Sequence, residues 1–166
     1  MSAVVRGKRV PSDLDSRDLG DHGLAGLVNI ASLIVERPFE LVPVDDLRHQ
    51  FEVNVIGQFA VTQAFIPLLR RGKGRVINVG AVRGRVAIPF LGPISASKAA
   101  LASLTDVLRM ESKPWGIAVS LIEPAAVPTP IFQKSGARAD RAMQQSSPDQ
   151  PAMYGPAIGS LSRCCC

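Results

Sequence analysis

Two residues whose side chains could take part in chemistry, Lys98 and Asn54, lie in stretches that are expected to be helical. Lys98 occurs in "ISASKAAL", and Asn54 occurs in "FEVNVIGQF". An ammonium group can donate a proton, and a carboxamide can donate and accept hydrogen bonds. Each residue also has a structural interpretation, because an inward-facing Asn can satisfy a backbone carbonyl and a Lys is commonplace in a first helical turn. The elements that hold them must therefore be considered before a reaction is inferred.

Three short runs rich in Val, Ile and Leu predict β-strands. They are "LAGLVNIA" at residues 24–31, "GRVINVGA" at residues 74–81 and "GIAVSLIEP" at residues 116–124. Such near-continuous apolar content is typical of parallel strands that are buried on both faces. We expect the three strands to form one sheet.

Two helices are predicted between these strands. The first covers residues 45–71, with Asp45 or Asp46 as its N-cap, and Pro67 is expected to bend its last turns. The second covers residues 95–111. The apolar positions expected to face the sheet are Leu47, Phe51, Val55, Phe59 and Phe65 or Ile66 in the first helix, and Ala99, Leu101, Leu104, Val107 and Leu108 in the second. This order of elements predicts an α/β fold, a partial Rossmann-like doubly wound parallel sheet with both helices on one face.

Composition divides the chain into three parts. Residues 1–23 are expected to be an irregular leader, residues 24–132 the folded domain, and residues 133–166 a mobile tail rich in Ser, Pro, Gln and Ala. The N-terminal stretch lacks a signal peptide, and no run approaches the ~18 apolar residues of a transmembrane helix. We therefore expect a soluble, cytoplasmic protein without a membrane span.

The three cysteines are the last three residues, Cys164, Cys165 and Cys166. They exclude a disulfide framework within the chain, because no cysteine elsewhere could close a loop. A C-terminal prenylation box would need Cys where Arg163 stands, and adjacent terminal cysteines are poor metal ligands. We interpret them as an incidental tail and expect no metal site.

The formal net charge is +5, and the densest basic run is "RRGKGR" at residues 70–75. Such a charge permits weak, salt-sensitive association with nucleic acid or an anionic membrane. However, the run lies between two apolar segments and contains no aromatic residue that could stack on bases. We interpret it as a solvated turn and expect no specific nucleic-acid partner.

Four stretches together resemble the central and C-terminal half of a short-chain dehydrogenase/reductase. They are "GLVNIAS", "FEVNVIGQFAVTQAFIPLLRRGKGRVINVGA", "ISASKAALASLTDVLRMES" and "GIAVSLIEPAAVPT", in the family's order and spacing over residues 21–132. The resemblance implies hydride transfer between NAD or NADP and a carbonyl/alcohol pair. In that family a Tyr four residues before a Lys exchanges the proton, since the two share a helix face and the ammonium lowers the phenol's pKa.

The resemblance assigns remnants of a catalytic site. Lys98 matches the family's Lys and Asn54 its proton-relay Asn, but the Tyr position is Ile94 and the Ser position is Ala81. Ser95 and Ser97 are close in sequence but rotated away on the helix. Two other candidates are set aside, because His49 reads as a surface or helix-packing residue and Tyr154, the single tyrosine, lies in the expected tail.

The cofactor half of the family pattern is also reduced. No glycine-rich turn precedes Leu24, although a dinucleotide needs backbone amides close to its pyrophosphate. By resemblance, the cofactor-binding positions that remain are Asn29, Lys98, Pro124 and Thr129, while the family's Gly after Pro124 is Ala125. NAD or NADP is thus the implied cofactor, although the glycine-rich turn that would bind its pyrophosphate is missing before Leu24.

These observations predict a degenerate member of the family, without dehydrogenase activity on its own, that acts as a scaffold or self-associating module. The alternative is an NAD(P)-dependent oxidoreductase with an unconventional acid or a partner that supplies the missing half. We expect a homo-oligomer or another chain to bind through the two helices, the family's usual dimer surfaces. A second expected contact is the edge of the strand at residues 24–31, since the strand that pairs with it in the intact fold is missing.

Overall fold

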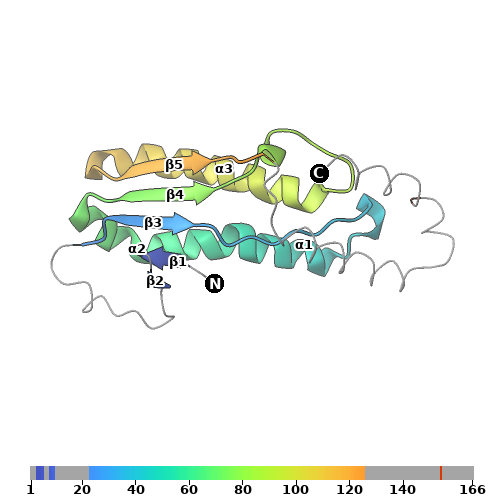
Figure 1. Cartoon of the computed structure of the whole chain (residues 1–166), viewed down its shortest axis with the longest axis horizontal. Coiled ribbons are helices and arrows are strands. Elements are labelled where there is room, and N and C mark those ends of the chain that lie inside the picture. The colour runs from blue at the N-terminus through green and yellow to red at the C-terminus, as the bar shows by residue number, and fades with distance from the viewer. Residues whose placement is uncertain (1–2, 6–7, 10–22, 126–153, 155–166) are drawn as a thin grey trace.

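The computed structural model describes residues 3–5, 8–9, 23–125 and Tyr154. The sheet has five strands in the order β2-β1-β3-β4-β5. β3 (Gly26–Asn29), β4 (Arg75–Val79) and β5 (Ala118–Ile122) are parallel, and β1 (Ala3–Val5) and β2 (Lys8–Arg9) form an antiparallel pair at the β3 side. The predicted α/β class and its three parallel strands are confirmed (Figure 1).

The N-terminal strands change two expectations. Residues 3–5 and 8–9 are strands, although an irregular leader was predicted for residues 1–23. Because Ala3 and Val4 pair with Asn29 and Val28, β3 has a neighbour on both sides, and the prediction that it is an open edge is wrong. Within the described sheet, the outer strands are β2 and β5. No local sequence pattern indicates this pairing, because it joins segments that are far apart in the chain.

The first helical stretch is continuous but not uniform. It consists of α1 (Val44–Phe51), a π-helical segment η3 (Glu52–Ile56) and α2 (Gly57–Gly72), and it continues past Pro67. Its N-cap is Pro43 and no side chain caps it, whereas Asp45 or Asp46 was predicted to do so. Both aspartates lie in the first turn instead, where a carboxylate favours the positive end of the helix dipole.

The second long helix and the short helical turns complete the framework. α3 (Gly92–Ser112) begins three residues earlier than predicted, and Pro93 lies in its first turn, where a missing N–H costs no bond. Three 3₁₀ turns, η2 (Phe39–Leu41), η4 (Val82–Gly84) and η5 (Lys113–Trp115), lie in the connections. The turn η5 joins α3 to β5, and η4 follows β4.

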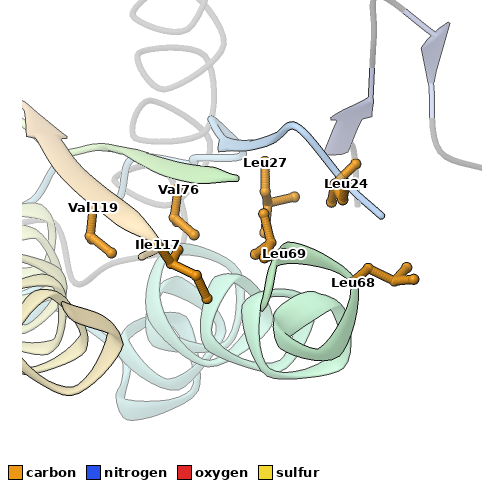
Figure 2. Packing of buried hydrophobic residues seen from close by; sticks show 7 residues of the cluster. All are labelled: Leu24, Leu27, Leu68, Leu69, Val76, Ile117 and Val119. Carbon is orange, nitrogen blue, oxygen red and sulfur yellow. The ribbon is translucent and has the colours of Figure 1, made fainter. Parts of the chain in front are cut away.

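The hydrophobic core lies between the sheet and one layer of helices. Leu27, Val76 and Val119 are aligned across the three parallel strands and point to the same face. They pack against Leu68 and Leu69 of α2 (Figure 2). Leu24 and Ile117 belong to the same cluster, and Val61, Phe65 and Leu108 pack at its margin. Both helices therefore cover one face of the sheet, as predicted.

The opposite face of the three strands is less covered. Arg75, Ala118, Ser120 and Ile122 are exposed, and Val28 is half-buried. The strands therefore alternate between buried and accessible positions, and the prediction that they are buried on both faces is wrong for the described residues. Alternation of this kind is typical of a sheet with one packed face.

The apolar side predicted for the two helices also differs from the buried side. Phe59 of α2 is 51% exposed, and Leu104 and Val107 of α3 are 38% and 43% exposed. Positions that face inward include polar residues instead: Gln50, Asn54, Gln58 and Thr62 on the first helical stretch, and Ser97, Lys98, Thr105 and Ser112 on α3. Periodicity located an apolar stripe on each helix, but part of each stripe faces outward.

Among the residues that the structure describes, one helix, Val44–Gly72, is long and apolar enough to cross a membrane by length and composition alone. In the fold it contacts β3 and α3. It also carries the buried polar positions named above, which bond to the loop after β3. Core helices of soluble proteins pass the same test, so this finding is weak evidence of a membrane span.

Candidate functional site

The polar residues of interest lie toward the carboxyl ends of the three parallel strands, where ligands bind in open α/β sheets. Lys98 is on α3, is only 4% exposed, and its Nζ donates a hydrogen bond to the carbonyl oxygen of Val79 at 2.8 Å. Burial lowers the pKa of Lys98 from 10.5 to about 8. The close approach of η4 to α3 helps to enclose this lysine, because a Cβ on Gly84 would come within 2.9 Å of the Lys98 carbonyl carbon.

The position one turn before Lys98 is filled by hydrocarbon. Ile94 is 3% exposed and belongs to the buried apolar residues. The two serines near Ile94 do not hydrogen-bond Lys98 through their hydroxyls. Ser97 Oγ donates to the Ile94 carbonyl oxygen at 2.9 Å. Ser95 Oγ is buried without a hydrogen-bond partner among the described residues. The expectation that neither serine replaces the missing hydroxyl is consistent with this geometry.

Asn54 lies in the π-helical segment η3 and is completely buried. Its Oδ1 accepts from the Leu33 amide at 2.9 Å, and its Nδ2 donates to the Leu33 carbonyl at 3.0 Å and to Ser97 Oγ at 3.1 Å. Both amide hydrogens are thus engaged, and the side chain ties α3 and the loop after β3 to the long helix. The relay role that the resemblance assigns to Asn54 stays a prediction.

Asn54 is one member of a row of four buried polar side chains, Gln50, Asn54, Gln58 and Thr62, which we call the polar row. Gln50 bonds the Val35 amide and the Leu33 carbonyl at 2.8 Å each, and Gln58 Nε2 donates to the Ala31 carbonyl at 2.6 Å. The polar row therefore holds residues 31–35 against the helix. A spacing of four residues drifts around a regular α-helix, and a π-helical segment with i→i+5 bonds widens the turn and counteracts that drift.

Asn29 occupies a second buried network, not an open position at the strand end. It is 4% exposed, and its Nδ2 donates to Thr62 Oγ1 and to Asn78 Oδ1, both at 2.8 Å. Asn78 Nδ2 donates in turn to Thr105 Oγ1 at 2.8 Å. This Asn29 ladder connects β3, β4, α2 and α3. Both donors of the Asn29 amide are engaged within the protein, so this NH₂ group would contact a cofactor only by giving up a buried bond.

The loops after β4 and β5 lie side by side. Val82, next to Ala81, donates its amide to the Pro124 carbonyl at 3.3 Å, and Arg85 Nε bonds both carboxylate oxygens of Glu123 at 3.0 and 3.2 Å. The structure thus brings Ala81 and Pro124 together. Thr129, the remaining predicted cofactor contact, lies outside the described residues. The cysteines Cys164–Cys166 also lie outside them.

Tyr154 contacts the loops before α1 and α3 and is not bonded to Lys98. Its hydroxyl donates to Glu40 Oε1 at 2.5 Å, and its ring meets Phe90 edge to face at a centroid distance of 6.0 Å. The hydrogen bond to Glu40 raises the pKa of Tyr154. A phenol that serves as a proton donor near neutral pH needs the opposite shift. His49 is exposed, which confirms its interpretation as a surface residue.

Two of the residues that the resemblance assigns to the cofactor, Lys98 and Asn29, are hydrogen-bonded within the protein. The Lys98 ammonium is enclosed and held by Val79, and the Asn29 amide is used inside the Asn29 ladder. Ala125 stands where the resemblance implies a glycine, so the backbone there has less room to approach a phosphate. What the site offers by itself is one buried amine with a pKa of about 8.

Comparison with known proteins shows which proteins this chain resembles. The model of the short chain dehydrogenase family matches residues 19–140. The 3-amino-tetrahydro-pyrrolizinone reductase of Xenorhabdus hominickii is 46% identical over 114 residues, which are 69% of this chain and 40% of that protein. The NADPH-dependent 3-dehydrocapnine reductase of Ornithobacterium rhinotracheale is 35% identical over 150 residues, which are 87% of this chain and 50% of that protein.

Solved structures agree in fold. A short-chain dehydrogenase of Burkholderia cenocepacia in complex with NADP is 32% identical, with a TM-score of 0.64 over 67% of this chain and 47% of that one. NAD+-bound xylitol dehydrogenase is 26% identical, with a TM-score of 0.65 over 71% of this chain and 46% of that one. The chain therefore spans about half of the length of these proteins.

Proposed function

Because this chain belongs to the short-chain dehydrogenase family, we propose that it retains the family's oxidoreductase scaffold but does not carry out the family's proton transfer on its own. The observation that supports this is the buried Ile94 one helical turn before Lys98. A hydrocarbon side chain has no proton to exchange with a carbonyl or an alcohol. Loss of a general acid typically costs a factor of 10² to 10⁴ in rate.

Replacement by the hydroxyl of Ser97 or of Tyr154 is not favoured by the contacts of these two residues. Ser97 Oγ donates to a backbone carbonyl, and Tyr154 is bound to Glu40 with its pKa raised. The family's Ser position is Ala81, which supplies no hydroxyl for a substrate oxygen. Two separate defects, at Ile94 and at Ala81, would therefore have to be compensated before hydride transfer could be fast.

A cofactor and turnover assay tests this proposal. The purified chain is mixed with NADH or NADPH and a panel of ketones and aldehydes, and thermal unfolding is followed with each nucleotide, since a ligand that binds the folded state raises the melting temperature. We expect no turnover. Turnover that persists through purification and is lost in Lys98→Met would refute the proposal, and Arg48→Gln, an exposed change on α1, is the matched control.

The second candidate function is an NAD(P)-dependent oxidoreductase in which Lys98 itself donates the proton. The observation in its favour is the pKa of about 8, which leaves a buried ammonium able to release a proton near neutral pH. This function predicts that carbonyl reduction slows as the pH rises through about 8, because the donor is then deprotonated. A rate that does not depend on pH in that range would exclude Lys98 as the acid.

We further propose that the chain self-associates through the outward faces of its two long helices. Ile56 and Phe59 are 49% and 51% exposed on the first helical stretch, and Val107 and Met110 are 43% and 68% exposed on α3. Burying such side chains stabilises a dimer by about 1.5–3 kcal/mol per fully buried residue. Sedimentation velocity should show a dimer that Phe59→Glu weakens, whereas Phe39→Glu, at a 91% exposed position on η2, should not. A monomer at all concentrations would refute this interface.

A further inference from the structure

A cluster of basic residues lies at the end of the molecule where β4 and β5 begin, opposite the Lys98 site. We call it the basic end; its members are Arg70, Arg71, Lys73, Arg75, Lys113 and the aromatic Trp115. All six are exposed. The two turns that carry most of them, between α2 and β4 and between α3 and β5, lie at the same end of the sheet (Figure 1).

Folding adds an aromatic residue that the basic run lacks in the sequence. The Arg70 guanidinium carbon lies 3.8 Å from the centre of the Trp115 ring, a cation–π contact between the two turns. Lys73 lies against the same turn, since a Cβ on Gly116 would come 3.8 to 4.0 Å from three of its side-chain carbons. The basic end is therefore one continuous surface and not a basic loop projecting alone.

The basic end takes part in none of the ion pairs found within the described part of the protein. Ion pairs in that part join Arg37 with Asp46, Arg48 with Asp45, Arg85 with Glu123 and Arg109 with Asp106, all outside the basic end. Cations near a helix C-terminus interact favourably with the dipole, which accounts for Arg70 and Arg71. That effect explains neither Arg75, which is on a strand, nor the presence of an exposed Trp.

We propose that the basic end binds the surface of a membrane that contains anionic lipids. Lys and Arg near such a surface each contribute about 1 kcal/mol, and Trp prefers the boundary between headgroups and acyl chains. Trp115 is 39% exposed, and Met110, in the last turns of α3, is 68% exposed. Single-stranded nucleic acid is less well matched, since it needs a ring face free for stacking and Arg70 lies over that of Trp115.

Trp115 is the single tryptophan of the chain, so its fluorescence reports directly on this surface. The chain is titrated with vesicles of phosphatidylcholine, or of phosphatidylcholine mixed with phosphatidylserine, and binding is also measured by co-sedimentation. We expect a blue shift of the emission and co-sedimentation with the phosphatidylserine vesicles, and weakening of both with salt. Equal binding to both kinds of vesicle, or none to either, would overturn the proposal.

Two variants with equal loss of charge provide the decisive comparison. Arg71→Gln with Lys73→Gln removes two positive charges from the basic end, and Arg48→Gln with Arg85→Gln removes two elsewhere. The first pair should weaken vesicle binding roughly fivefold per charge, about 25-fold in all, and the second should change it little. Equal effects of the two pairs would show that only net charge matters and would overturn the proposal. Tighter binding to a single-stranded oligonucleotide than to vesicles, lost in the first pair, would overturn it in favour of nucleic acid.

Discussion

Replacing Lys98 by Met should abolish one component of the pH dependence of folding stability. The folded protein holds this lysine with a pKa of about 8, compared with 10.5 for an exposed lysine, because burial disfavours the charged form. Between these two pH values the unfolded chain keeps its proton while the folded chain loses it. The unfolded state then binds more protons, so the free energy of unfolding rises with pH across this interval.

The size of the effect follows from the interval between the two pKa values. Each pH unit corresponds to about 1.4 kcal/mol, so the change from 10.5 to about 8 is worth about 3 kcal/mol. Below pH 8 the lysine is protonated in both states, and its contribution no longer changes with pH. Met has similar length but no amine, so the Lys98→Met protein should lack the rise.

Urea unfolding at a series of pH values measures this rise for both proteins. Tyr154 works in the opposite direction, because its raised pKa makes stability fall as the pH passes about 10. The comparison is therefore made in a Tyr154→Phe background, which removes that titration. Two results would refute the reasoning: a flat profile between pH 8 and 10.5 in the protein with Lys98, or an equal rise in the protein with Met.

Three further predictions concern packing and the Tyr154 contact. Asn78→Ala removes two buried hydrogen bonds of the Asn29 ladder and should lower the free energy of unfolding by about 2–3 kcal/mol, whereas Ser120→Ala, at an exposed position on β5, should change it by less than about 0.5 kcal/mol. Gly72→Ala should cost about 1–3 kcal/mol, because its Cβ would come 2.7 Å from the Leu24 carbonyl oxygen, and Gly92→Ala, where the nearest atom is 3.8 Å away, should cost nothing in the same denaturation assay. Tyr154→Phe should abolish the fall in stability above about pH 10, and an unchanged fall by urea unfolding would contradict the bond to Glu40.

The sequence was sufficient to predict the three parallel strands and the two long helices, because apolar runs and turn residues mark their limits. It was not sufficient to predict which side of each helix is buried. The inward side of the first helical stretch carries the polar row. Burial of its amide side chains is compensated by their hydrogen bonds to the backbone of residues 31–35. Polar residues at intervals of four were the available signal, and a π-helical segment was needed to align them.

The candidate site was predicted in part. The resemblance identified Lys98, Ile94 and Asn54 as neighbours, and the structure joins Asn54 to Ser97, one residue before Lys98. The internal use of Asn29 could not be read from the chain, since its partners Thr62 and Asn78 are 33 and 49 residues away. The contact between Tyr154 and Glu40 spans 114 residues and has no local signature either.

The Asn29 ladder helps to specify the register between β3 and β4. Asn29 and Asn78 are directly opposite each other on β3 and β4, and each also bonds a threonine on a covering helix. A slip of two residues between these strands would keep the same face inward but would set Asn29 opposite Val76 or Gly80, and Asn78 opposite Ala31 or Leu27. None of these residues has a side chain that can hydrogen-bond an amide. Each stranded amide would cost about 1–3 kcal/mol. The pair of asparagines thus excludes misaligned sheets that apolar packing alone would tolerate.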